Sequence, residues 1–455
     1  MKELKIILTE EMLSKAFDFN LLSNVLYIDR SNVGLEKERN HNLIGFAQRE
    51  PFVKDLLIYL ASNGFYLVSS FNGISKFEKF IDAESFNHNV KVNNLQIYKD
   101  IYYTLNTPLL DFADKRLIII FSSIADLAFN ADIARRNFFV NFTTINKYIP
   151  QNTYVLRIGD IGGVLGNFYM NTIYSDRIES EIQDLIKFIL LSNNIHENNV
   201  VLYGASKGGT ASLYHAILGG YKCVAVDPIV SDEYHEEYSF DSHFTKPRKL
   251  HKIYSQSKQE KFSNLMKNNK VPNKINIIYS QQSPIYNSIN TIIKDNDTEN
   301  KIKYLNVCHP KIKTHPDVAI NTINILMSVI NNLFYDLSEI RSKDIDCDRS
   351  IEKKKIEITA ELKLTKLIIY RNSNNIKLRV YSLDLEQYSE LELDKPISEI
   401  SLFKLKGKNL SIVDMDTLLE YKLVIDLKKS SILSKIASYK DIEKDGQIFS
   451  FLAIG

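Results

Sequence analysis

The chain contains few of the residues from which covalent or metal-bound frameworks are built. Its 455 residues include no tryptophan and only three cysteines, Cys223, Cys308 and Cys347. The cysteines show no CxxC spacing, and the nine histidines form neither an HxxxH nor an HExxH pattern. A disulfide framework and a metal site are therefore not expected. Reduced thiols in a cytoplasmic protein are the simplest account, and no pattern indicates a cofactor.

Strong charge of one sign and long apolar segments are also absent. The formal net charge is only +2, which gives no reason to expect nucleic acid or an anionic membrane as a partner. No segment approaches the roughly 20 apolar residues that cross a bilayer. The apolar run near Met1 is too short for a signal peptide. We therefore expect a cytoplasmic protein that does not span a membrane.

The length of the chain favours two or three domains, and the composition changes along it. We predict a mixed α/β N-terminal region over residues 1–110, an α/β domain over 111–335 and a separate, mainly β domain over 350–455. Residues 336–355 are dense in charge, which is typical of a linker. Beyond them, apolar and polar residues alternate with the period of strands.

Apolar strands alternate with helical patterns in the middle of the chain. This alternation predicts a mostly parallel sheet with helices packed on it. An insertion at about 229–270, rich in His, Tyr, Lys and Asp, is expected to cap the site, and a helix is expected over 316–334. The predicted strands cover residues 117–121, 153–158, 200–203, 222–227, 275–279 and 302–308.

The centre of this pattern is Ser206. The strand at 200–203 leads into the sequence GASKG at 204–208, and a helix-compatible segment follows at 210–218. In this context G-x-S-x-G is typical of a nucleophile elbow, in which a sharp strand-to-helix turn raises the serine above the sheet. The prediction is an α/β-hydrolase fold with Ser206 as the nucleophile. As an alternative, the glycines serve only close helix–strand packing and Ser206 is a passive cap.

A serine hydroxyl needs a base to take its proton. In this fold the histidine follows the last core strand, and both His309 and His315 lie there. His315 is preferred because it directly precedes Pro316, which suits the first turn of the final helix. Either histidine could instead be an ordinary loop residue.

The acid is harder to place. Many hydrolases carry it after the penultimate strand, in a stretch resembling G-x-x-D-P, where this chain has Ser283 in place of the aspartate. Asp227, at the end of the preceding strand, is the preferred candidate. A serine–histidine dyad oriented by Ser283 or Gln282 is the alternative. The other carboxylates considered are Asp232, Asp295 and Asp297.

An oxyanion hole needs two backbone donors directed at the developing charge. One is expected from the N–H of Lys207, the residue after the nucleophile. The other is expected from Ser122 or Ser123, in the loop after the strand at 117–121. The Lys207 side chain is expected either to add positive charge at the mouth of the site or simply to be solvated.

A second glycine cluster, residues 157–166, follows the strand at 153–158 and lacks the G-x-G-x-x-G spacing of a dinucleotide site. Its place at the edge of the sheet makes it a candidate wall of the pocket. Arg157, Asp160, Gly162 and Gly163 are the predicted substrate-binding residues, directed at sugar hydroxyls or a phosphate. Alternatively, Arg157 and Asp160 pair with each other.

Two stretches of the chain resemble a known family. YGASKGGTASLY at 203–214 and LRIGDIGGVLGNFY at 156–169 are similar to the XcbB/CpsF-type capsular polysaccharide biosynthesis proteins of bacteria, a resemblance that covers about residues 100–335. The same core is more distantly similar to the accessory-secretion protein that O-acetylates sugars on surface glycoproteins. The resemblance implies acyl transfer to a glycan or glycan precursor, with Ser206 carrying the acyl group and other capsule proteins as partners.

Three functions are compatible with these observations. The preferred one is a serine O-acyltransferase or esterase that acts on a capsular or related surface glycan. The second is a catalytically inactive scaffold that binds a glycan or a biosynthetic partner, suggested by the serine at position 283. The third, an enzyme of another class in the same pathway, ranks last because no Walker or Rossmann signature supports it.

Overall fold

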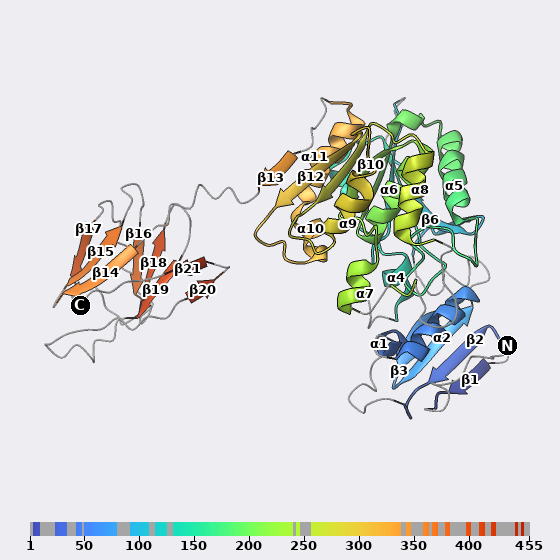
Figure 1. Cartoon of the computed structure of the whole chain (residues 1–455), viewed down its shortest axis with the longest axis horizontal. Coiled ribbons are helices and arrows are strands. Elements are labelled where there is room, and N and C mark those ends of the chain that lie inside the picture. Colours follow the sequence, from blue (N-terminus) through green and yellow to red (C-terminus); the bar gives the residue numbers. More distant parts are fainter. Residues whose placement is uncertain are drawn as a thin grey trace. The chain divides into compact units, whose positions relative to one another are not determined.

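The computed structural model divides the chain into two compact units, residues 1–347 and 348–455 (Figure 1). Each unit forms its own sheets, and the structure describes part of each. In the first unit the described residues are 3–9, 23–33, 42–47, 50–79, 92–108, 114–124, 131–239, 243–245, 256–337 and 343–346. In the second unit they are the strands alone.

The first unit is built on a nine-stranded sheet. Every neighbouring pair from β13 to β8 is parallel, whereas β6 and β5 join the other edge in antiparallel register. The expected α/β class with a mostly parallel sheet is thereby confirmed. In spatial order the strands are β13 (Lys343–Asp346), β12 (Ile302–Cys308), β11 (Ile275–Tyr279), β10 (Lys222–Val226), β9 (Val200–Ala205), β7 (Arg116–Phe121), β8 (Thr153–Ile158), β6 (Ile101–Asn106) and β5 (Gln96–Tyr98).

Both ends of this sheet reach beyond the predicted limits of 111 and 335. β5 and β6 precede residue 111, and β13 lies inside the stretch that its charge suggested was a linker. β13 pairs with β12 along one side only, as the outermost strand. An edge strand tolerates charged residues because its free side can face water. Charge density alone therefore did not separate an edge strand from a linker.

Helices cover both faces of the sheet (Figure 1). Leu117, Ile119 and Leu202 pack toward one face, under α5 (Ile178–Asn193), α6 (Lys207–Gly219) and α8 (Lys258–Asn268). The intervening residues Ile118, Ile120 and Val201 pack toward the other face, under α11 (Ile323–Phe334). Apolar residues on both sides of each strand explain the unbroken apolar runs of the sequence.

The last helical segment is broken, unlike the continuous helix expected over 316–334. α10 (His315–Asn321) ends at Thr322, whose φ of −116° leaves the helical region before α11 starts. The Thr322 hydroxyl donates to the carbonyl of Val318 at 2.8 Å. Such a bond back to the preceding turn competes with helix continuation.

Shorter elements complete the core of the unit. Those that matter for the site are α7 (Glu233–Ser239) in the insertion after β10, and α4 (Ile133–Asn137) before β8. The others are the 3-10 turns η3 (Ile145–Lys147) and η4 (Glu197–Asn199), helix α9 (Tyr286–Ser288) and the π-helical turn η5 (Ile289–Lys294). None of the helices among the described residues has both the length and the apolar character that crossing a bilayer requires.

The N-terminal part of the first unit forms a second, smaller sheet. Its order is β1-β2-β4-β3, and only the β1–β2 pair is parallel. Arg136 of α4 donates to the carbonyls of Leu67 and Val164, so this sheet is tied to the larger one through a buried guanidinium. The elements are β1 (Glu3–Ile7), β2 (Val25–Asp29), α1 (Leu43–Ala47), α2 (Pro51–Ser62), β3 (Phe65–Phe71) and β4 (Ile74–Lys79).

All described residues of the second unit are strands, and they pair antiparallel. A mainly β character for the whole of 350–455 stays a prediction. The sheets are β14-β15-β17, β16-β18-β19 and β20-β21. Their strands are β14 (Ile358–Lys363), β15 (Lys366–Arg371), β16 (Leu378–Ser382), β17 (Ile397–Ser401), β18 (Asn409–Asp414), β19 (Glu420–Val424), β20 (Ile442–Lys444) and β21 (Gln447–Phe449).

Candidate active site

Ser206 stands between the end of β9 and the start of α6, near the middle of the sheet. Its φ of 56° and ψ of −121° lie outside the regions that an L-residue ordinarily adopts. This strained turn from strand to helix is the geometry of a nucleophile elbow. The turn leaves the serine partly exposed, although its neighbours on both sides are buried.

The elbow needs glycine because backbone segments approach each other closely there. A Cβ at Gly204 would lie 2.0 Å from the carbonyl oxygen of Gly208. A Cβ at Gly208 would lie 2.3 Å from the carbonyl oxygen of Phe121, on the neighbouring strand β7. Neither contact is possible for a side chain, so the motif is required by the packing of α6 against β9 and β7.

Three polar side chains form a continuous hydrogen-bonded row at this elbow. His315 Nε2 lies 2.7 Å from Ser206 Oγ, and His315 Nδ1 lies 2.7 Å from Asp227 Oδ2. His315 is the first residue of α10, whose start is held by the Thr314 N–H donating to Asp317 Oδ2 at 2.8 Å. The chain order serine, aspartate, histidine is that of α/β-hydrolases. The arrangement can move a proton from the serine hydroxyl to the imidazole.

The Asp227 carboxylate follows β10, the strand next to the elbow strand. Its φ of 43° turns the residue out of the strand, and its side chain is nearly inaccessible to solvent. The Ser283 hydroxyl donates to Asp227 Oδ2 at 2.7 Å, on the same oxygen that meets His315. Ser283 thus contacts the carboxylate and not the imidazole. Asp227 Oδ1 is buried and has no hydrogen-bond partner.

The other candidate imidazole and amide are used elsewhere. His309 Nδ1 accepts from the backbone N–H of Lys311 at 3.2 Å. Gln282 Oε1 accepts from the backbone N–H of His309 at 3.2 Å. These contacts close the loop after β12, and the structure does not bring either side chain to Ser206.

The alternative carboxylates also have structural partners. Asp232 binds the ammonium of the buried Lys258, and this charge is a main reason that the pKa of Asp232 is lowered despite the opposing effect of burial. Asp297 accepts from the backbone N–H groups that lead into β12, at 2.9 and 3.0 Å. Asp295 is exposed at the end of η5. None of the three meets His315.

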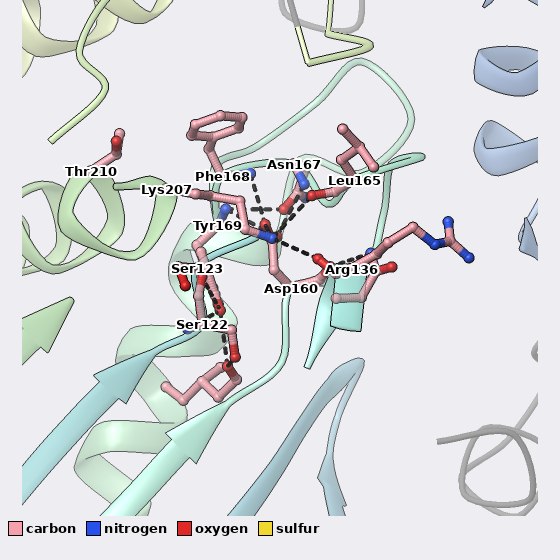
Figure 2. Close-up of polar contacts among 12 residues, drawn as sticks. Ser122, Ser123, Arg136, Asp160, Leu165, Asn167, Phe168, Tyr169, Lys207 and Thr210 are labelled. Atoms are coloured by element: carbon pink, nitrogen blue, oxygen red, sulfur yellow. Dashed lines mark hydrogen bonds and ion pairs between the residues drawn. The ribbon is translucent and has the colours of Figure 1, made fainter. Parts of the chain in front are cut away.

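The loop after β7 does not present free donors at the positions expected for the oxyanion hole. The N–H of Ser122 donates to Tyr169 Oη at 2.7 Å (Figure 2). The N–H of Ser123 donates to Asn141 Oδ1 at 3.0 Å. Either group could bind an oxyanion only by giving up its present acceptor. The Lys207 N–H, by contrast, belongs to the first turn of α6, where backbone donors have no partner within the helix.

The side chain of Lys207 neither lies at the mouth of the site nor is solvated, which corrects both expectations. It is fully buried, and its ammonium lies 2.9 Å from Asp160 Oδ2 and 3.0 Å from the carbonyl oxygen of Leu165 (Figure 2). Burial lowers the pKa of Lys207, and the Asp160 carboxylate opposes that shift.

Asp160 and Arg157 are likewise structural rather than open to a ligand. The Asp160 carboxylate accepts the N–H groups of Asn167, Phe168 and Tyr169 at 3.0–3.2 Å, besides its pair with Lys207. Arg157 does not pair with Asp160. Instead, the Arg157 guanidinium donates to the carbonyls of Asn141 and Phe142, in the segment between α4 and η3.

The two predicted glycines belong to the same folded loop. Gly162 has φ of +130°, and a Cβ on Gly163 would lie 2.3 Å from the carbonyl oxygen of Gly166. The loop that contains these glycines folds around the Asp160 carboxylate, and a role of their backbone in substrate binding stays a prediction. From the same loop, the Phe168 side chain packs with Ile229 and Ile285 in a small apolar cluster.

The insertion after β10 brings a residue to the site that the sequence analysis did not identify. His235 of α7 has its ring centroid 6.3 Å from that of His315, at an interplanar angle of 89°. Burial and the positive potential of His243, His315 and Lys258 lower its pKa to about 3. The abundance of histidine and tyrosine in the insertion was the available signal, but no spacing linked His235 to the elbow. Among the described residues, no group of three or more His, Cys, Asp or Glu side chains is arranged to hold a metal ion.

Comparison with solved structures finds proteins of similar build at low identity. The fluorophosphonate-binding serine hydrolase FphF of Staphylococcus aureus is 12% identical over 53% of this chain and 95% of its own, with a TM-score of 0.38. The capsule O-acetyltransferase of Neisseria meningitidis serogroup A is 14% identical over 52% of this chain and 94% of its own, also with a TM-score of 0.38. The glycosylation-associated Gap123 complex of Streptococcus agalactiae is 14% identical over 57% of this chain and 50% of its own, with the same TM-score of 0.38.

No protein-family model and no curated protein matches the chain by sequence. The resemblance to capsular polysaccharide biosynthesis proteins therefore stays a prediction. The assignment of an α/β-hydrolase type of fold rests on the strand order, on the elbow at Ser206 and on the chain order of the hydrogen-bonded row.

Proposed function

We propose that the chain is a serine-dependent O-acyltransferase or esterase that works through an acyl-Ser206 intermediate. The observation that carries the proposal is the unbroken row from Ser206 Oγ through the imidazole of His315 to Asp227, with 2.7 Å at each step. Nucleophile, base and orienting acid within hydrogen-bond reach are the signature of activated serine chemistry.

In the proposed reaction, His315 Nε2 takes the proton of Ser206 as its Oγ attacks the carbonyl carbon of an acyl donor. Asp227 orients the ring through Nδ1 and stabilises the imidazolium that forms. The Lys207 N–H and the positive end of the 13-residue helix α6 face the charge on the carbonyl oxygen. His315 returns its proton to the leaving group, and an acyl-serine remains. Water or an alcohol then takes the acyl group by the reverse sequence.

We propose a capsular or related cell-surface glycan, or its precursor, as the substrate, with the protein in the cytoplasm beside other capsule biosynthesis proteins. The support for this part is the sequence resemblance at 156–169 and 203–214. The non-catalytic scaffold was suggested by the missing acid at position 283. Since Asp227 meets His315 from the neighbouring strand instead, that reason no longer favours a scaffold.

Covalent labelling with a fluorophosphonate probe tests the proposal. We expect rapid labelling of the wild-type protein, none of Ser206→Ala, and labelling slowed by at least about a hundredfold in His315→Gln, because the hydroxyl loses its base. His309→Gln is the matched control, since the Nδ1 of that ring accepts from the backbone N–H of Lys311 in its own loop, and it should be labelled at the wild-type rate. Equal labelling of the wild type and Ser206→Ala would reject the proposal.

A further inference from the structure

The insertion after β10 contributes a second imidazole beside the one that serves Ser206. His235 and His315 stand edge to face at 6.3 Å between ring centroids. The preceding residue, Tyr234, packs against the apolar cluster of Phe168, Ile229 and Ile285. This contact fixes α7 over the carboxyl ends of the central strands, so His235 is held next to the reacting groups.

A row of side chains behind His235 holds its ring in place. The ring of His243 lies 4.3 Å from it between centroids, and His243 Nδ1 lies 3.7 Å from Asp232 Oδ1. Asp232 in turn binds the buried ammonium of Lys258. Each of these four side chains therefore has a neighbour that restricts it, and the row ends at the site.

One of the two ring nitrogens of His235 has no hydrogen-bond partner among the described residues. This nitrogen, Nδ1, is buried, and the ring as a whole is half-buried. The lowered pKa, caused mainly by burial, keeps the ring neutral in the physiological range. A neutral imidazole offers one N–H donor and one acceptor nitrogen. Such a group beside His315 is suited to a ligand that both accepts and donates hydrogen bonds, which is the property of a hydroxyl.

We propose that His235 binds the acyl acceptor and that this acceptor is an alcohol, so that the acyl-enzyme is resolved by transfer in preference to hydrolysis. This inference rests on the acyl-Ser206 intermediate proposed above. The acceptor hydroxyl lies between the two imidazoles, donating to His315 and contacting His235. His315 takes the hydroxyl proton while the acceptor oxygen bonds to the acyl carbon. The bond from that carbon to Ser206 Oγ then breaks, and Ser206 Oγ recovers the proton from His315. The product is an ester of the acceptor.

The partition of one intermediate between alcohol and water tests this role. With p-nitrophenyl acetate as donor and glycerol or a methyl glycoside as acceptor probe, the ratio of acetyl ester to free acetate is measured for the wild type and for His235→Phe. Phenylalanine keeps a ring against His315 but has no nitrogen. We expect the ratio to fall about tenfold, the effect of losing one hydrogen bond. His235→Gln, which keeps a donor and an acceptor, should recover part of it, and His309→Gln should match the wild type.

The ratio is insensitive to partial unfolding of a variant, because both products come from the same acyl-enzyme. An unchanged ratio in His235→Phe, or a wild-type protein that makes no ester with either alcohol while Ser206 is still labelled, would overturn the role of His235 and leave the proposed serine chemistry intact. Whether or not His235 has this role, the Ser206→Ala variant should not be labelled by the fluorophosphonate. If Ser206 of the wild type is not labelled, the proposed function itself fails.

Discussion

At the level of single side chains, the carboxylate of the proposed triad has two partners on one of its oxygens. One oxygen of Asp227 meets both His315 and the Ser283 hydroxyl, each at 2.7 Å. Ser283 lies in the loop after β11, the position at which many hydrolases of the α/β type carry the acid. Its hydroxyl therefore reaches the same point in space that an aspartate at position 283 would approach.

This juxtaposition predicts that the acid can be moved between the two loops. Asp227→Ser should lower kcat by roughly 10⁴-fold, because the imidazole loses its orienting carboxylate. Adding Ser283→Asp to that variant should raise its kcat at least about tenfold. The measurement is kcat on p-nitrophenyl acetate, with circular dichroism to show that each variant is folded. A folded double variant no faster than Asp227→Ser would show that Ser283 does not share the acid's position.

The residues of the site differ in how far sequence could identify them. Ser206 stands in a motif whose neighbours are forced by backbone contacts, and His315 precedes a proline that starts a helix. The buried ion pair between Lys207 and Asp160 could not be predicted, because the sequence shows two charged residues but neither their contact nor their burial. His235 was also missed, since its place depends on where helix α7 packs, which its sequence does not show.

At the level of secondary-structure elements, the Lys207–Asp160 pair joins α6 to the glycine loop. Both side chains are inaccessible to solvent. The pair lies directly behind the elbow, so it connects the first residue of the helix with residues 160–169 of the loop. Breaking a buried pair leaves an uncompensated charge, and that is much costlier than losing a surface pair.

Lys207→Met should therefore destabilise the first unit by about 3–5 kcal/mol. Lys99→Met is the matched control, because it removes a pair with Asp184, at 2.6 Å, whose two side chains are both exposed, and its unfolding midpoint should barely change. Urea unfolding followed by far-ultraviolet circular dichroism compares the two. Similar midpoints for both variants would mean that the buried pair adds no net stability.

The elements themselves were predicted best where strands are buried on both faces. The runs at 117–121 and 275–279 coincide with β7 and β11 to within one residue. Short runs made mostly of apolar residues are typical of strands that are buried on both faces of a sheet. Edge elements were harder to recognise. β13 contains charged residues. β5 and β6 lie in an aromatic-rich stretch that we assigned to the N-terminal region, and its composition did not show that it joins the larger sheet. The break at Thr322 depends on one side-chain bond to the preceding turn.

At the level of the whole molecule, all residues of the proposed triad and its supports lie in the first unit. Ser206, Asp227, Ser283 and His315 all lie within residues 1–347, and the second unit begins at residue 348. The sheets of the two units are separate. Serine chemistry should therefore not require the second unit.

A fragment of residues 1–347 is expected to fold and to be labelled by a fluorophosphonate at Ser206 at a rate within about threefold of the full chain. The comparison uses equal concentrations of both proteins, with Ser206→Ala of the fragment as the blank. A folded fragment that is not labelled would place part of the active site in residues 348–455. Loss of transfer to a large glycan, with labelling retained, would instead assign acceptor recruitment to the second unit.

The proposed nucleophile and the proposed acid follow two neighbouring strands, β9 and β10, that pair in parallel. The N–H of Ser206 donates to the carbonyl of Val226 at 2.9 Å, and Asp227 is the next residue along. The distance between the two is consequently set by the interstrand spacing of the sheet and is as rigid as the sheet itself. Only the imidazole arrives from elsewhere, at the end of the 309–314 connection. Displacing that one connection would separate the imidazole from both groups, while the paired strands that carry Ser206 and Asp227 would stay in place.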